Sequence, residues 1–157
     1  MSKYESYGVP DLGFKALIGK RVETIDINPD RDLLRFSLAG GEVIYASAVG
    51  GCCSRSWFES IEGVDALIGH EVLRVTDRAM PPENDKTGDP EYGSLIQFYG
   101  WTIETSRGRF DIEMRNESNG YYGGEVIVSD VASDQYRTER DYEYASDFRQ
   151  LQPWESK

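Results

Sequence analysis

Residues 95–129, LIQFYGWTIETSRGRFDIEMRNESNGYYGGEVIVS, contain two long runs in which apolar and polar side chains alternate. Alternation of this kind predicts strands that turn one face toward a core. Arg107-Gly108 and the segment 119–124 interrupt the runs, so we expect two long strands and a shorter third one. With Arg107-Gly108 as a two-residue turn, Glu104 would lie opposite Asp111. The predicted core face consists of Tyr99, Trp101, Ile103, Phe110, Ile112 and Met114.

The other face of this predicted hairpin carries three carboxylates, those of Glu104, Asp111 and Glu113. Like charges directly opposed destabilise a cross-strand pair, so one interpretation is a small cation site or a surface for a basic partner. The alternative is an ordinary solvated face, on which these carboxylates pair with Arg109 and Arg115. No histidine joins the set, and the spacing of a calcium loop is absent. We therefore predict no metal and no other cofactor.

The segment from Asn116 to Gly124 breaks the alternation and is rich in glycine, asparagine and tyrosine. Asn-Gly favours a tight turn, and adjacent glycines allow another group to approach the backbone closely. Two tyrosines on such a turn form a flat amphipathic surface of the kind found at binding sites. In the alternative interpretation, one tyrosine folds over the sheet and the glycines only serve the turn. The predicted binding residues are Asn116, Asn119, Gly120, Tyr121, Tyr122 and Gly123, with Trp57 as a further candidate.

Composition and charge limit the classes of function. The chain has 157 residues, of which 39% are hydrophobic and 12% aromatic, so we predict one globular domain over residues 1–157. A net charge of −11 disfavours direct binding to nucleic acid or to an anionic membrane, because phosphate contacts need clustered lysine and arginine. No apolar run of membrane-spanning length and no secretory signal are found. We expect a cytoplasmic protein whose partner is another protein or a small-molecule ligand.

An internal repeat predicts the overall organisation. Ala16-Leu17-Ile18-Gly19 recurs as Ala66-Leu67-Ile68-Gly69, and each copy precedes a predicted strand. Two further strands follow in both copies, which predicts two similar three-strand units at about 16–46 and 66–128. The predicted fold class is α+β, mainly antiparallel sheet built from these two units, which pack together to bury their apolar faces. Residues 79–94 are polar and predict a flexible insertion within the second unit.

One short helix is predicted between the two units. Ser56 followed three residues later by Glu59 fits a capping box, which marks the start of a helix. The spacing of the next apolar side chains then favours a helix with one buried stripe. That stripe would consist of Trp57, Phe58 and Ile61.

A second helix is predicted in the acidic, tyrosine-rich segment 130–157. Tyr144, Phe148 and Leu151 have helical spacing, and Pro153 would end the helix. The predicted molecule is thus a β-sheet protein with one central and one C-terminal helix.

Adjacent cysteines, Cys52 and Cys53, precede the predicted central helix, and a helix start is a position that activates thiols. A catalytic cysteine usually needs a base, and the only histidine of the chain is His70. In the repeat, His70 takes the place of Lys20, just after the Leu-Ile-Gly turn, where we expect solvent. The alternative is two small buried thiols packed under Trp57. The pair supplies a second functional hypothesis, a thiol-dependent enzyme that uses Cys52 or Cys53.

Two motifs carry a resemblance to a known family. Cys52-Cys53-Ser54-x-Ser56-Trp57 and Asn116-x-Ser118-Asn119-Gly120-Tyr121-Tyr122-Gly123-Gly124 resemble a family of small bacterial and phage proteins, a domain of unknown function. The similarity spans roughly residues 17–128 and includes the Asp-Ile-Glu-x-Arg-Asn strand at 111–116. Members commonly have Asp where Gly51 stands, and this departure counts against an active site at the cysteines. The resemblance implies a phage origin and assigns no activity, cofactor or catalytic residue.

The leading hypothesis is a non-enzymatic binding module, encoded by a phage and acting in the host cytoplasm. It would engage a host protein or a small ligand through the 116–124 segment. The thiol-dependent enzyme is the alternative. A structural virion component is a third hypothesis, which predicts self-assembly or tight association with a capsid or tail protein.

Overall fold

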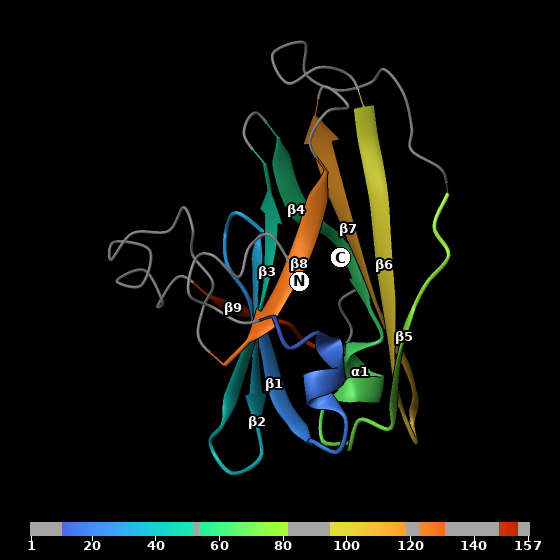
Figure 1. Cartoon of the computed structure of the whole chain (residues 1–157). Helices are drawn as coiled ribbons and strands as arrows, with labels where there is room; N and C mark the ends of the chain where they lie inside the picture. Colours follow the sequence, from blue (N-terminus) through green and yellow to red (C-terminus); the bar gives the residue numbers. More distant parts are fainter. Residues whose placement is uncertain (1–10, 52–53, 82–94, 119–122, 131–147, 154–157) are drawn as a thin grey trace.

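The computed structural model describes residues 11–51, 54–81, 95–118, 123–130 and 148–153, and these form two antiparallel sheets that face each other (Figure 1). The first sheet contains β1 (Val22–Ile27), β2 (Leu33–Leu38), β3 (Val43–Gly50), β8 (Gly124–Ser129) and β9 (Arg149–Gln150), in the order β8-β3-β2-β1-β9. The second sheet contains β4 (Arg55–Glu62), β5 (Arg74–Asp77), β6 (Leu95–Thr105) and β7 (Gly108–Ser118), in the order β4-β7-β6-β5. The prediction of a mainly antiparallel β protein is confirmed.

The hydrophobic core lies between the two sheets. Phe36 of β2 and Phe110 of β7 meet edge to face with ring centroids 6.4 Å apart, so the two sheets are in direct aromatic contact. The predicted core face of β6 and β7 is confirmed: Tyr99 and Trp101 pack against the core partly buried. The fully buried members of that face are Ile103, Phe110, Ile112 and Met114.

The predicted central helix is wrong, because the segment is the strand β4. Ser56 and Phe58 point into the sandwich and are buried, whereas Trp57 lies between them on the outer face. A register shift between Phe58 and Ser60 marks a bulge, after which Ile61 points inward again. Ser60 is also buried, but the next buried apolar side chain after Phe58 is that of Ile61, three residues later, and this apolar spacing resembles a helical period. Among the described residues, the helical elements are single turns, η2 (Phe14–Leu17) and α1 (Val64–Leu67).

The predicted C-terminal helix is also wrong. The described part of that segment contains the short strand β9, which pairs with the end of β1. Leu151 is buried, and its amide donates to the carbonyl of Ile25 (2.8 Å). The fold is therefore an all-β sandwich rather than α+β. None of the described residues belongs to a helix long and apolar enough to cross a membrane.

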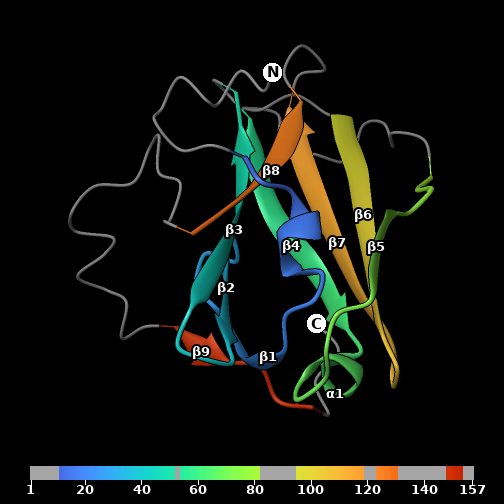
Figure 2. The ribbon, with the colours of Figure 1, turned by 60° about the horizontal axis from the view of Figure 1, so that its bottom comes forward.

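The two Leu-Ile-Gly turns lie beside each other and exchange hydrogen bonds (Figures 1 and 2). The amide of Gly19 donates to the carbonyl of Val72 (2.8 Å), and the amide of Gly69 donates to the carbonyl of Val22 (2.7 Å). Both glycines have positive φ, 84° and 83°, a conformation that glycine adopts without strain. Each pair of equivalent residues is 50 positions apart, so the contact has approximate two-fold symmetry. It joins the meander β1-β2-β3 of one sheet to the meander β5-β6-β7 of the other.

The β6–β7 register differs from the predicted one by two residues. Thr105 pairs with Gly108, so Ser106 and Arg107 form the turn and Glu104 lies opposite Arg109 instead of Asp111. The amide of Arg107 donates to the Thr105 hydroxyl (3.1 Å), which holds the chain in this turn. A shift of two leaves every side chain on its predicted face, but it removes the predicted opposition of like charges.

Candidate binding site at one end of the sandwich

Two connections cross between the sheets at the same end of the sandwich. The chain leaves the first sheet at Gly50 and enters the second at Arg55, and it returns from Ser118 of β7 to Gly124 of β8 (Figure 1). Because β3 pairs with β8 and β4 pairs with β7, the two crossings are neighbours at both of their ends. The topology therefore brings together the 51–56 and 116–124 segments, which are about sixty residues apart in the sequence.

Asn116 connects the two crossings. Its side chain is completely buried, and its Nδ2 donates to the hydroxyl oxygens of Ser56 (2.9 Å) and Ser54 (3.3 Å). The Ser56 hydroxyl donates to the carbonyl of Val49 (2.9 Å), and the Ser54 hydroxyl donates to the carbonyl of Gly51 (2.9 Å). The Asn116 amide of β7 thus holds Ser54 and Ser56, and through their hydroxyls it holds the carbonyls of Gly51 and Val49 at the other end of the β3–β4 connection. Asn116 itself lies just before the β7–β8 connection. We call Ser54, Ser56 and Asn116 the motif junction.

The carbonyl oxygen of the same side chain has no partner. Asn116 Oδ1 is buried and accepts no hydrogen bond from the described part of the chain. A buried acceptor without a donor costs about 1–3 kcal/mol, so its retention needs a reason.

Two paired glycines make room for the motif junction. Gly50 and Gly124 lie opposite each other in the first sheet. A Cβ on Gly50 would lie 2.4 Å from the Ser54 hydroxyl, and one on Gly124 would lie 2.7 Å from the Ser56 hydroxyl. Both distances are shorter than van der Waals contact. Glycine is required here because the backbone of one sheet passes directly over the polar side chains of the other.

Tyr99 ties the same end of β8 to the second sheet. The amide of Gly124 donates to the Tyr99 hydroxyl (3.1 Å), and that hydroxyl lies 3.3 Å from Gln97 Oε1, to which it donates. Gly123 is half-buried, and a Cβ there would lie 3.3 Å from the Tyr99 hydroxyl. The apolar core therefore gives way at this end to a layer of hydroxyl and amide groups.

The described residues place part of the predicted binding set here. Asn116 is at the centre of the motif junction, but it is buried rather than presented on the surface. Gly123 lies beside the ends of the Tyr99 and Gln97 side chains. Trp57 is half-buried on the outer face of β4, where its Nε1 donates to Glu59 (3.0 Å) and the guanidinium of Arg55 lies over its ring. The other predicted residues, Asn119, Gly120, Tyr121, Tyr122, Cys52 and Cys53, lie outside the described residues.

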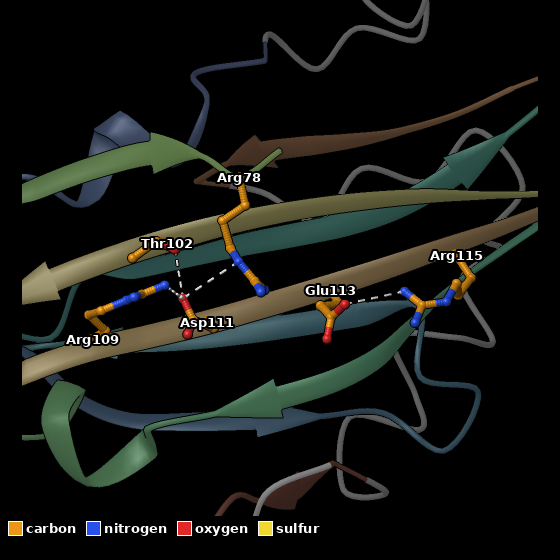
Figure 3. A network of polar contacts seen from close by, with 6 residues as sticks. All are labelled: Arg78, Thr102, Arg109, Asp111, Glu113 and Arg115. Atoms are coloured by element: carbon orange, nitrogen blue, oxygen red, sulfur yellow. Dashed lines mark hydrogen bonds and ion pairs between the residues drawn. The ribbon is translucent and has the colours of Figure 1, made fainter. Parts of the chain in front are cut away.

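The three carboxylates considered for a cation site each have an arginine partner. Asp111 accepts from Thr102 (2.6 Å) and Arg109 (3.4 Å) and lies 4.0 Å from Arg78, as Figure 3 shows. Glu113 forms an ion pair with Arg115 at 3.7 Å. Glu104 accepts from Arg74, and this hydrogen bond raises the pKa of the Arg74 guanidinium. No group of three metal-ligating side chains occurs within the described ranges. This face is a charge-balanced outer surface.

His70 lies at the opposite end of the sandwich from the cysteine-bearing connection. Its amide donates to Leu67 at the end of α1, and α1 is held to the β6–β7 turn by the hydrogen bond from Thr105 to Ala66 (2.5 Å). Between that turn and Asn116, β7 advances eight residues, roughly 26 Å at 3.3 Å per residue. Within one copy of the chain, His70 is therefore far from Asn116 and from the serines bonded to it.

Sequence reasoning missed Ser54, Ser56, Gly50 and Gly124 as parts of one site. Ser56 was predicted to start a helix, where its hydroxyl would have capped an amide of its own segment, and Ser54 was given no role of its own. The available signal was that both serines belong to the motif at 52–57, which Gly50 precedes, and that Gly124 ends the motif at 116–124. What pairs these residues is the order of strands in two sheets, which no local pattern specifies.

A family model described as a domain of unknown function (DUF7448) matches residues 15–128. The matched range includes more than half of the chain and contains every residue of the motif junction. No curated protein and no solved structure matches the chain. The description of the family assigns no reaction, so the function has to be inferred from the geometry above.

Proposed function

We propose that the protein, which belongs to the DUF7448 family, is a non-enzymatic binding module. The 51–56 and 116–124 segments would act together as one recognition surface at the end of the sandwich. The observation that supports this proposal is the shared Asn116 amide, which hydrogen-bonds both serines of the other motif. A surface built from two distant segments keeps its shape only if the segments are fixed to each other, and the motif junction does this.

The chemistry of the motif junction suits binding better than simple packing. A buried polar network is costly unless all its groups are satisfied, and apolar side chains would fill the same space at lower cost. Here the network is retained next to two connections between strands, the part of a scaffold where binding residues usually lie. Its role in the proposal is to position the residues of both segments, while the residues themselves contact the partner.

The partner that we propose is a protein or a small ligand rather than nucleic acid. The net charge of −11 repels phosphate, and the arginines of the outer face are already paired with carboxylates. Following the resemblance of the two motifs, we further propose that the protein is encoded by a phage and acts in the cytoplasm of its host.

Native mass spectrometry tests this function. The full chain is purified from bacterial cytosol under native conditions, and its native and denaturing masses are compared for the wild type and for Tyr121→Ala/Tyr122→Ala. We expect a non-covalent partner on the wild type, loss of that partner in the double variant, and an unchanged melting temperature.

Leu73→Ala provides the control, because the apolar side chain of Leu73 is exposed (56% accessible). The backbone amide of Leu73 donates to the carbonyl of Glu104, near the opposite end of β6. This variant should keep the partner. A wild type that carries nothing, or a partner that stays on the tyrosine variant, would contradict the proposal.

A further inference from the structure

A cleft lies on the open side of the sandwich, between the edge strands β8 and β5. It is a cavity of about 480 Å³, and Phe14 and Lys15 of η2 belong to its lining. The ribbon of η2 (Phe14–Leu17) is drawn in blue in Figures 1 and 2. Its apolar lining comes from four elements: Phe14 of η2, Val75 of β5, Tyr99 and Trp101 of β6, and Val126 of β8. A volume of this size suits a small organic molecule and is far too large for a single metal ion.

Aromatic rings form one wall of this cleft. Trp101 packs against Phe14 with ring centroids 5.4 Å apart at a tilt of 55°, so the indole is held in place. Trp101 and Tyr99 are both only partly buried. Fixed, partly exposed aromatic rings bind flat ligands and attract cations to their faces.

Charged groups at the cleft select the sign of the ligand. Three carboxylates, those of Asp11, Asp77 and Glu125, line the cavity together with one ammonium group, that of Lys15. Asp11 Oδ1 already accepts the amides of Gly13 and Val128 (both 3.0 Å). Asp77 is exposed and forms no ion pair or side-chain hydrogen bond with the described residues. The excess of negative charge favours a cation.

The free edge of β8 adds a backbone donor and acceptor. The amide and carbonyl of Val128 point away from β3, toward Asp11 and Leu12. Along a strand, residues two apart direct these groups to the same side, so those of Val126 also face the free edge. Within the described segments they have no backbone partner there. Val126 thus presents an N–H and a C=O to whatever occupies the cleft.

We propose that this cleft binds a small organic cation, an ammonium or guanidinium group carried on a flat aromatic body. The ring would lie against Trp101 and Tyr99, and the cationic group would lie near Asp77 and Glu125. The Val126 backbone would hydrogen-bond polar atoms of the ligand, and Lys15 would disfavour a second positive charge. The cleft borders the motif junction through Gly124 and Tyr99, but it contains none of Ser54, Ser56 and Asn116. Binding of a cation here is a further activity and does not depend on the function proposed above.

Nuclear magnetic resonance tests the proposal with two matched probes. The full chain, labelled with ¹⁵N, has three tryptophans and therefore three indole N–H signals, and Trp101→Phe identifies the one from Trp101. The probes are tryptamine, a cation, and indole-3-propionate, an anion of similar size. We expect tryptamine to shift the Trp101 signal and leave that of Trp57 unchanged, with a Kd at least tenfold lower than that of indole-3-propionate.

Charge variants complete the test. Asp77→Asn should weaken tryptamine binding about threefold, a modest effect because the carboxylate is exposed, and Lys15→Ala should strengthen it by a similar factor. Asp30→Asn, which removes an exposed carboxylate in the β1–β2 connection, is the matched control and should leave the Kd unchanged. Equal affinity for the two probes, or equal effects of the Asp77 and Asp30 variants, would overturn the proposal. Tryptamine that shifts Trp57 and not Trp101 would do the same.

Discussion

At the scale of single residues, Asn116 shows how a short motif acts at a distance. Its amide reaches the hydroxyls of Ser54 and Ser56, which lie at the start of the neighbouring strand β4 and are about sixty residues away in the sequence. The composition of the 116–124 segment predicts Asn116 as a binding residue presented on a loop, whereas its side chain is completely buried. Burial could not be predicted, because it depends on β4 lying next to β7, a long-range pairing. Local patterns identify such residues without indicating which side chains they meet.

The close packing around Gly124 leads to a prediction at the scale of single residues. Gly124→Ala should lower the free energy of unfolding by about 1–3 kcal/mol, because the new methyl group would lie 2.7 Å from the Ser56 hydroxyl and 2.9 Å from Asn116 Cβ. Gly123→Ala is the matched control, since its methyl group would meet only the ends of Tyr99 and Gln97, at 3.3 and 3.4 Å. Urea unfolding of both variants measures the difference. Equal losses would mean that β8 does not pass closely over the serines.

At the scale of elements, β4 shows where periodicity misleads. Without the bulge, inward residues would alternate from Ser56 onward and the strand would be evident. The bulge shifts the register between Phe58 and Ser60. Ser60 at the bulge is buried, and the spacing is two residues from Ser56 to Phe58 and three from Phe58 to the next buried apolar side chain, Ile61. Those spacings, together with Ser56 and Glu59 at capping-box distance, favoured a helix. The long hairpin β6–β7 has no bulge, and its two faces were predicted correctly.

Adjacent aromatic residues distinguish the strand from the predicted helix. In a strand, Phe58 and Trp57 lie on opposite faces, so Phe58→Ala should cost about 3–5 kcal/mol because its ring is fully buried. Trp57→Ala should cost only roughly 1–2 kcal/mol, the contribution of its contacts with Glu59 and Arg55. Chemical denaturation of the two variants gives both values. In a helix with a shared buried stripe, the two losses would be alike.

At the scale of the whole molecule, two meanders face each other and are joined at both ends. One end has the reciprocal hydrogen bonds of Gly19 and Gly69, and the other has the motif junction. The Ala-Leu-Ile-Gly repeat predicts two similar meanders, and it leaves open whether they form one sheet or two. Residues 124–129, which were expected to belong to the second unit, add a strand to the first sheet instead. Because β8 joins the first sheet, the chain has to cross between the sheets a second time after β7. This second crossing forms one half of the candidate site.

The separation of the two ends bears on the thiol-dependent alternative. About 26 Å of β7 separate the β6–β7 turn, to which α1 beside His70 is held, from Asn116. We therefore expect His70 not to influence the chemistry of Cys52 and Cys53. We expect the rate of alkylation of Cys52 and Cys53 by iodoacetamide to have the same pH profile in the wild type and in His70→Gln. A displaced midpoint in the variant would indicate a thiol–imidazole contact and would favour the enzyme.

The central claim is that Asn116 makes one surface out of two distant segments, and hydrogen exchange measured by mass spectrometry tests it most directly. In Asn116→Ala, amides of residues 49–57 and of residues 117–126 should both exchange about tenfold faster than in the wild type, while residues 103–112 should be unchanged. Thr102→Ala removes a different buried polar side chain of the same sheet, and it should leave the exchange rates of both segments unchanged. Faster exchange in only one of the two segments would contradict the claim.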